Sequence, residues 1–181
     1  MTATLESSLR KRYDALQAQL APDTPITVLE LGAEHTGVAS GSAHAPAATL
    51  VLAIGSQHTA RAFFKHAVPT PLELETAIAT VEDEVTRARA ILAQGSQLYT
   101  TDAAVREIAL LAGVPAAATL HLTLEAVEHT FNRLTALSLG RPATQDVLPP
   151  NAAFAATLLI LREFMHHLQF ASITVVNSLG N

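Results

Sequence analysis

Hydrophobic positions near the start of the chain follow a helical spacing. They recur every three or four residues between polar ones, which is typical of an amphipathic helix. The apolar residues of this stripe are Leu5, Leu9, Tyr13, Leu16 and Leu20. We expect a helix that ends at Pro22, so that residues 1–22 form a packing or dimerising arm. Its basic triplet, residues 10–12, is interpreted as a solvated helix face.

Continuous apolar and β-branched runs come next, and they predict buried strands. The first is Ile26–Leu31, and Thr36–Ser40 is expected to pair with it as a hairpin. Ala48–Ile54 predicts a third strand, closed by Gly55. Three consecutive strands therefore precede the next long helix.

Helical spacing returns in the second half of the chain, with clear start signals. Thr70, Pro71 and Glu73 form the pattern of an N-cap, a first helical position and a capping box, and the apolar stripe continues to Leu92. The further expected elements are a strand at 97–101, helices at 103–112 and from 123, a helix apolar nearly all round at 154–168, and a strand at 172–176. This order predicts an α/β domain over residues 23–181, with the 154–168 helix at its centre.

Composition narrows the function classes. The 181 residues carry a net charge of −5, no cysteine and few aromatic residues, which argues against a nucleic-acid surface and excludes thiol chemistry. No apolar run reaches the length of a membrane span, and the N-terminus lacks the pattern of a signal peptide, so we expect a cytoplasmic protein. Because charged residues are scarce, we expect apolar surface that serves a homodimer or a protein partner.

The turn between the first two strands is the candidate ligand loop, formed by Glu30, Gly32, Glu34, His35 and Thr36. A strand that ends in small residues lets backbone N–H groups approach a phosphate, and a hydroxyl adds a donor. The carboxylate and the imidazole ring stand where an anion would need open backbone. Two interpretations remain, an ordinary hairpin with a glycine turn and a working ligand loop.

A second candidate turn joins the 97–101 strand to the next helix at Thr100, Thr101 and Asp102. A helix N-terminus can hold a phosphate, but an aspartate there competes with the anion, so we expect Asp102 to cap the helix. We predict no metal site. The acidic run at 82–84 and the adjacent His166 and His167 point in diverging directions on helices, and no histidine pair has ligand spacing.

Several segments in order resemble the C-terminal lobe of the exopolyphosphatase/guanosine pentaphosphate phosphohydrolase (Ppx/GppA) family. Leu-Glu-Leu-Gly-Ala-Glu-His-Thr falls where that family has Val-Asp-Ile-Gly-Gly-Gly-Ser-Thr. The resemblance extends from about Thr24 to Asn177 and rests on residues 29–36, 52–64, 69–75, 122–127 and 148–176. It implies an actin-like, ribonuclease-H-like lobe, with three strands that start antiparallel and then alternating helices and strands.

The family's activity implies phosphoanhydride hydrolysis between two lobes, assisted by a metal ion. This sequence departs from the family where phosphate would bind. Ala33, Glu34 and His35 replace Gly-Gly-Ser, Gly37 replaces Glu, and Thr101 and Asp102 replace a glycine pair. We therefore expect a degenerate stand-alone lobe without catalysis or cofactor, which acts through oligomerisation or a partner.

The alternative is a phosphatase or a binder of phosphate or polyphosphate, which includes one half of a split enzyme. In it His35 would act as general acid/base beside Glu30. Mg²⁺ is expected only in this case.

Overall fold

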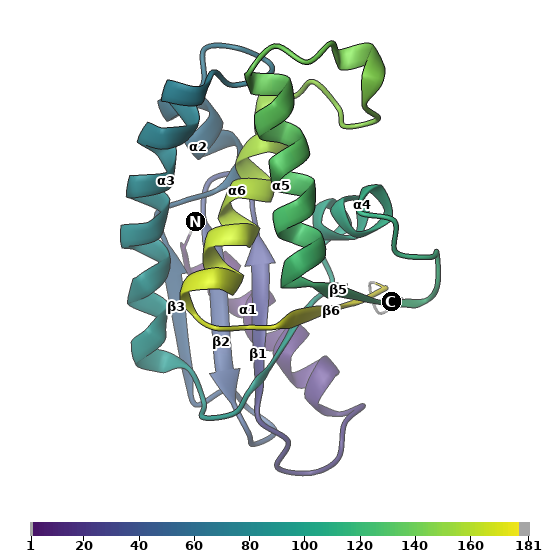
Figure 1. Cartoon of the computed structure of the whole chain (residues 1–181). Helices are drawn as coiled ribbons and strands as arrows, with labels where there is room; N and C mark the ends of the chain where they lie inside the picture. The colour runs from purple at the N-terminus through teal and green to yellow at the C-terminus, as the bar shows by residue number, and fades with distance from the viewer. Residues whose placement is uncertain (1, 178–181) are drawn as a thin grey trace.

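A computed structural model describes residues 2–177 and contains one six-stranded mixed sheet (Figure 1). The strand order is β3-β2-β1-β4-β6-β5. The first three strands form an antiparallel meander, β1 pairs in parallel with β4, β4 pairs in parallel with β6, and β5 closes the sheet antiparallel to β6. The strands are β1 Ile26–Leu31, β2 Thr36–Gly41, β3 Ala48–Leu52, β4 Gln97–Thr100, β5 Thr119–Thr123 and β6 Ser172–Val176.

Helices cover both faces of this sheet. Helix α1 packs on β1, β2 and β3 from one side, and α6 lies on the other side in contact with α2, α3, α4 and α5 (Figure 1). The helices are α1 Thr2–Gln17, α2 Ser56–Phe63, α3 Pro71–Thr86, α4 Ala103–Leu111, α5 Leu124–Ser138 and α6 Ala152–His167, with 3₁₀ turns η1 Arg87–Ile91 and η2 Ala143–Gln145. The predicted α/β lobe, with three strands before the alternating part, is confirmed.

The start of α3 shows how a local signal sets an element boundary. Thr70 Oγ1 accepts a hydrogen bond from the Glu73 N–H at 3.3 Å, and Glu73 Oε2 accepts one from the Thr70 N–H at 2.7 Å. The backbone N–H of Thr70, joined by that of Lys65, lowers the pKa of Glu73 to about 2. Because both orphan donors at the helix start are satisfied, the capping box predicted here is confirmed.

Two hydrophobic clusters lie on opposite faces of the sheet. The larger one surrounds α6, of which eleven residues are buried, as expected for a helix that is apolar nearly all round. The smaller one joins the α1 residues Leu9, Tyr13 and Leu16 to the sheet. These three residues of the α1 stripe therefore pack against the sheet within the chain, as the packing interpretation of this arm expects.

Three expectations about elements were wrong. The N-terminal helix, expected to end at Pro22, ends at Gln17. Strand β5 was not predicted, although Thr119–Thr123 alternates exposed and buried residues as a half-buried strand does. The long helix predicted to reach Leu92 ends at Thr86 and continues only as the 3₁₀ turn η1. Across residues 2–177, no helix has the length and apolar character that crossing a bilayer demands.

Candidate functional site

The β1–β2 hairpin loop, residues 32–35, has an internal contact that requires glycine at its first position. The Gly32 N–H donates a 3.0 Å hydrogen bond to the His35 carbonyl oxygen. A Cβ atom at Gly32 would lie 2.7 Å from that same oxygen. The glycine is explained by the closure of the turn, as the ordinary-hairpin interpretation expects.

The carbonyl groups of this loop accept hydrogen bonds from the backbone N–H groups at the start of α2. The Ser56 N–H donates to the Gly32 oxygen at 3.0 Å, and the Ala33 oxygen accepts from Gln57 at 2.9 Å and from His58 at 3.0 Å. The first N–H groups of a helix are the donors that would otherwise bind an anion. Here the hairpin loop occupies these three.

Gly55 lets the loop approach α2 this closely. A Cβ atom at Gly55 would lie 2.5 Å from the Glu34 carbonyl carbon, 2.6 Å from the Ala33 oxygen and 2.7 Å from the His35 nitrogen. Gly55 has φ −160°, a conformation open to any residue. Its lack of a side chain is needed for the contact and not for the backbone angle.

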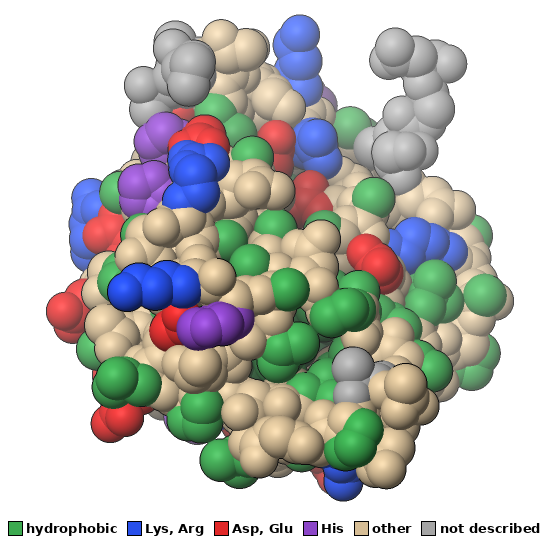
Figure 2. All heavy atoms as spheres, turned by 90° about the horizontal axis from the view of Figure 1, so that it is seen from above, with side chains coloured by type: hydrophobic (Ala, Val, Ile, Leu, Met, Phe, Trp, Pro, Cys, Tyr) green, Lys and Arg blue, Asp and Glu red, His purple; other side chains and the backbone are tan. Residues whose placement is uncertain are grey.

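The side chains of the candidate loop point to different partners. Glu34 Oε2 pairs with Arg61 Nη2 at 2.7 Å, and this hydrogen bond lowers the pKa of Glu34. The Thr36 hydroxyl is buried and donates to the Ile54 carbonyl at 2.8 Å. Within residues 2–177, no hydrogen bond or ion pair joins His35 to Glu30. Figure 2 looks at the molecule from above, where basic, acidic and histidine side chains gather at one side.

Asp102 does not cap α4, which corrects the expectation from sequence. Its side chain makes no capping hydrogen bond. Instead Asp102 Oδ2 accepts the backbone N–H of Leu31 at 2.6 Å, at the end of strand β1. The Thr100 hydroxyl accepts the Asp102 N–H at 3.1 Å. The second candidate turn is thus tied to the first one through a single carboxylate.

Arg12 of α1 completes this junction, which corrects the expectation that all of residues 10–12 belong to a solvated helix face. Its Nη1 donates to Thr101 Oγ1 at 2.6 Å and to Asp102 Oδ1 at 3.3 Å, and its Nε lies 3.4 Å from Glu30 Oε2. We call Arg12, Glu30 and Asp102 the Arg12 cluster.

A signal in the sequence could have found Arg12. It lies three residues after Leu9 and four before Leu16, so it lies at the edge of the buried stripe of α1.

The Arg12 cluster holds two carboxylates that burial makes hard to ionise. Burial raises the pKa of Asp102 to about 6, with the Glu30 charge adding to the rise and the Leu31 N–H and Arg12 opposing it. Burial also raises the pKa of Glu30, against Arg12 and the Ser8 hydroxyl. Strongly perturbed carboxylates mark candidate functional sites. Because a guanidinium already lies between them, these two carboxylates do not offer an open site for a metal ion.

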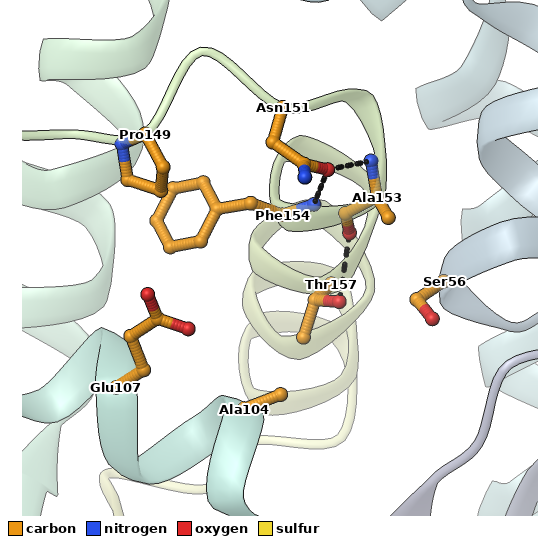
Figure 3. Close-up of a pocket in the computed structure, with 8 residues that line it drawn as sticks. All are labelled: Ser56, Ala104, Glu107, Pro149, Asn151, Ala153, Phe154 and Thr157. Atoms are coloured by element: carbon orange, nitrogen blue, oxygen red, sulfur yellow. Dashed lines mark hydrogen bonds between the residues drawn. The ribbon is translucent and has the colours of Figure 1, made fainter.

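A hollow of about 230 Å³ lies where α2, α4 and α6 begin (Figure 3). Asn151 Oδ1 caps α6 by accepting the N–H groups of Ala153 and Phe154 at 2.8 and 3.2 Å. Ser56 and Glu107 face the hollow from opposite sides. A carboxylate in this position disfavours a phosphate. In the part of the chain that the structure describes, no three His, Cys, Asp or Glu side chains converge to hold a metal ion.

Comparison with known proteins gives a result at the level of structure alone. No protein-family model matches the chain, and no curated protein sequence matches it. A crystal structure of the Aquifex aeolicus member of the Ppx/GppA family superposes with a TM-score of 0.77 at 18% sequence identity, covering 95% of this chain and 58% of its own. This chain has the fold of one Ppx/GppA lobe.

A second Ppx/GppA-like structure agrees. An exopolyphosphatase from Cytophaga hutchinsonii superposes with a TM-score of 0.70 at 14% identity, covering 91% of this chain and 57% of its own. The chain thus spans less than three fifths of the length of either of these two proteins. The resemblance expected from the sequence is confirmed for the fold.

Proposed function

We propose that this chain is a degenerate relative of the Ppx/GppA lobe that acts by binding and not by hydrolysis. One observation supports this most directly. The backbone N–H groups of Ser56, Gln57 and His58 already donate hydrogen bonds to the carbonyl oxygens of the hairpin loop, at Gly32 and Ala33. Phosphate loops work because backbone N–H groups stay free to meet the anion. At this hairpin the backbone has closed on itself.

The second turn supports the same proposal. Where a phosphate would need open backbone after β4, the Asp102 carboxylate and the Arg12 guanidinium fill the space between Leu31 and Thr101. The side chain that reaches the backbone N–H of Leu31 is an anion itself. A phosphate oxygen could not take that place without displacing Asp102.

Phosphate release tests the absence of hydrolysis. The purified chain is incubated with polyphosphate and with guanosine pentaphosphate, each with and without Mg²⁺, beside an active exopolyphosphatase as a positive control. We expect no phosphate above the protein-free blank. Turnover that requires Mg²⁺ would overturn the proposal.

We propose a second copy of this chain as the binding partner. An apolar groove of about 230 Å³ lies between α3 and α5, lined by residues that include Leu74, Ile78 and Phe131. Leu139 lines this groove and has 77% of its surface exposed, and Leu72, which follows the lining residue Pro71 in the chain, is 72% exposed. One surface thus carries both a hollow and a protruding apolar side chain. A two-fold contact brings the same patch of each copy together, so Leu139 of each copy can enter the other's groove.

Light scattering tests this assembly. We expect the mass of a dimer at micromolar concentration, with at least roughly 1,000 Å² buried in total. A monomer mass would contradict the proposal.

The second candidate function is that of a phosphatase or phosphate binder, alone or as one half of a split enzyme. It is favoured by one observation, that about two fifths of the length of the matched Ppx/GppA structures lies outside the part that this chain covers. In that case Mg²⁺-dependent phosphate release should fall when His35 is replaced by alanine. A rate that is unchanged in the His35→Ala variant would remove His35 as its acid/base group.

A further inference from the structure

Three segments that are distant in sequence meet at the Arg12 cluster. Arg12 comes from α1, Glu30 from the end of β1, and Asp102 from the turn after β4. One guanidinium contacts both carboxylates, at 3.3 Å for Asp102 and 3.4 Å for Glu30. The Leu31 N–H adds a 2.6 Å hydrogen bond to the free oxygen of Asp102.

The charges in this cluster do not balance. With both carboxylates ionised, two negative charges share one positive charge, and their side chains are only 12% and 10% exposed for Glu30 and Asp102. The uncharged groups that face the cluster are the hydroxyls of Ser8 from α1 and of Thr100 and Thr101 from the β4–α4 turn. Among the described residues, no other cation lies within ion-pair distance of either carboxylate. A partly buried net charge favours the uptake of one proton.

We infer that the Arg12 cluster is a proton-sensitive junction between helix α1, the β1–β2 hairpin and the β4–α4 turn. When Asp102 is ionised, its two oxygens hold the Arg12 guanidinium and the Leu31 N–H at once. When it takes up a proton, Glu30 is the only anionic partner left to the guanidinium, beside the Thr101 hydroxyl, and the hydrogen bond from Leu31 loses its charge assistance. The hairpin loop, residues 32–35, begins directly after Leu31, so the proton acts on the backbone that leads into that loop. This inference does not depend on the proposed function.

The effect of burial on the pKa values of the two carboxylates supports the same inference. Burial raises the pKa of Asp102 to about 6, so the change falls in mildly acidic solution. The pKa of Glu30 is raised too, and the two groups interact, so the midpoint belongs to the pair.

Nuclear magnetic resonance on the unmodified chain provides the first test. The carboxyl carbon of Asp102, the backbone amide of Leu31 and the Nε–H of Arg12 are followed from pH 4 to pH 8. We expect the three signals to change together with one midpoint near pH 6, and the Leu31 change to vanish in Asp102→Asn. A Leu31 amide that does not follow the Asp102 carboxyl carbon would overturn the inference.

Replacement of the arginine provides the second test. In Arg12→Met the carboxylates lose their shared cation, so we expect the midpoint to rise by at least about one pH unit, a tenfold change in proton affinity. Arg10→Met is the matched control, because Arg10 lies on the same helix and bonds to Thr49 instead. A midpoint that is equal in the two variants would refute the role of Arg12. If Arg12→Met does not fold, the measurements on the unmodified chain and on Asp102→Asn still decide.

Discussion

The backbone N–H of Leu31 donates a 2.6 Å hydrogen bond to the side chain of Asp102, 71 residues further along the chain. The ladder between the parallel strands β1 and β4 has its last pair at Val28 and Tyr99, so this bond continues the connection where the ladder has stopped. A side chain here does what backbone pairing does elsewhere in the sheet. The two turns at this end of the sheet are therefore not independent of each other.

Asp102→Asn is expected to flatten the dependence of stability on pH. Asp102 titrates near 6 in the folded protein against 3.8 in the unfolded chain, so the folded state binds the proton more tightly. The contribution of Asp102 to the free energy of unfolding should therefore be highest below pH 4 and fall by about 3 kcal/mol as the pH rises through 6. The Asp102→Asn variant lacks this fall, so its free energy of unfolding should rise relative to that of the parent over the same pH interval.

Urea unfolding at pH 4, 5, 6 and 7 measures this difference. Asp83→Asn, an exposed position on α3, is the control and should follow the parent. Parallel curves for the parent and Asp102→Asn would show that Asp102 titrates normally.

Gly55→Ala is expected to lower the free energy of unfolding by about 3 kcal/mol, the upper part of the range for forced overpacking. The new methyl group would lie 2.5–2.7 Å from three backbone atoms of the hairpin loop, which cannot rotate away as a side chain can. Chemical unfolding gives the number, and Ser56→Ala next to it controls for a change at the start of α2. If Gly55→Ala lowers the free energy of unfolding by less than the control does, the hairpin loop can move away from the methyl group without loss of stability.

Glu34→Gly combined with His35→Gly restores the glycines that a phosphate loop would have. We expect no binding of pyrophosphate by the parent or by the double variant, because the loop carbonyls still occupy the three N–H groups at the start of α2. Titration calorimetry with pyrophosphate measures this. Binding that appears only in the double variant would show that the two side chains, and not the closed backbone, block the anion.

Leu139→Ser is expected to convert the proposed dimer into a monomer. Because 77% of Leu139 is exposed, the substitution should leave the folded lobe intact. Val147→Ser is the matched control, since Val147 is 72% exposed and does not line the groove. Light scattering that gives a dimer for both variants would place the interface on another surface.

Local signals in the sequence predicted the elements whose causes are local. Thr70 and Glu73 start α3 by bonding to each other's backbone, and both lie within four residues. The apolar composition of α6 placed it at the centre for an equally simple reason, because a helix without a polar face must be covered.

The contacts of the Arg12 cluster join residues that no local pattern connects. Aspartate is a residue type that often caps helices, and Asp102 directly precedes α4. Its side chain bonds instead to the Leu31 N–H and to Arg12, which lie far from it in the sequence. Strand β5 was missed because the start of α5 at Thr123 is a strong helix signal that follows it immediately. The candidate loop was located by its glycine, but its closure by α2 depends on the three-dimensional approach at Gly55.

The bonds between the hairpin loop and α2 make these two segments one cooperative unit. The N–H groups of Gln57 and His58 have Ala33 as their acceptor, so the loop cannot lift without unpairing the first turn of the helix. Fraying of α2 and opening of the hairpin are then the same event, and amide hydrogen exchange at Gln57 should report on both. A loop that serves as a helix cap gives up the freedom to close over a small molecule, and this lobe has kept the rigid arrangement.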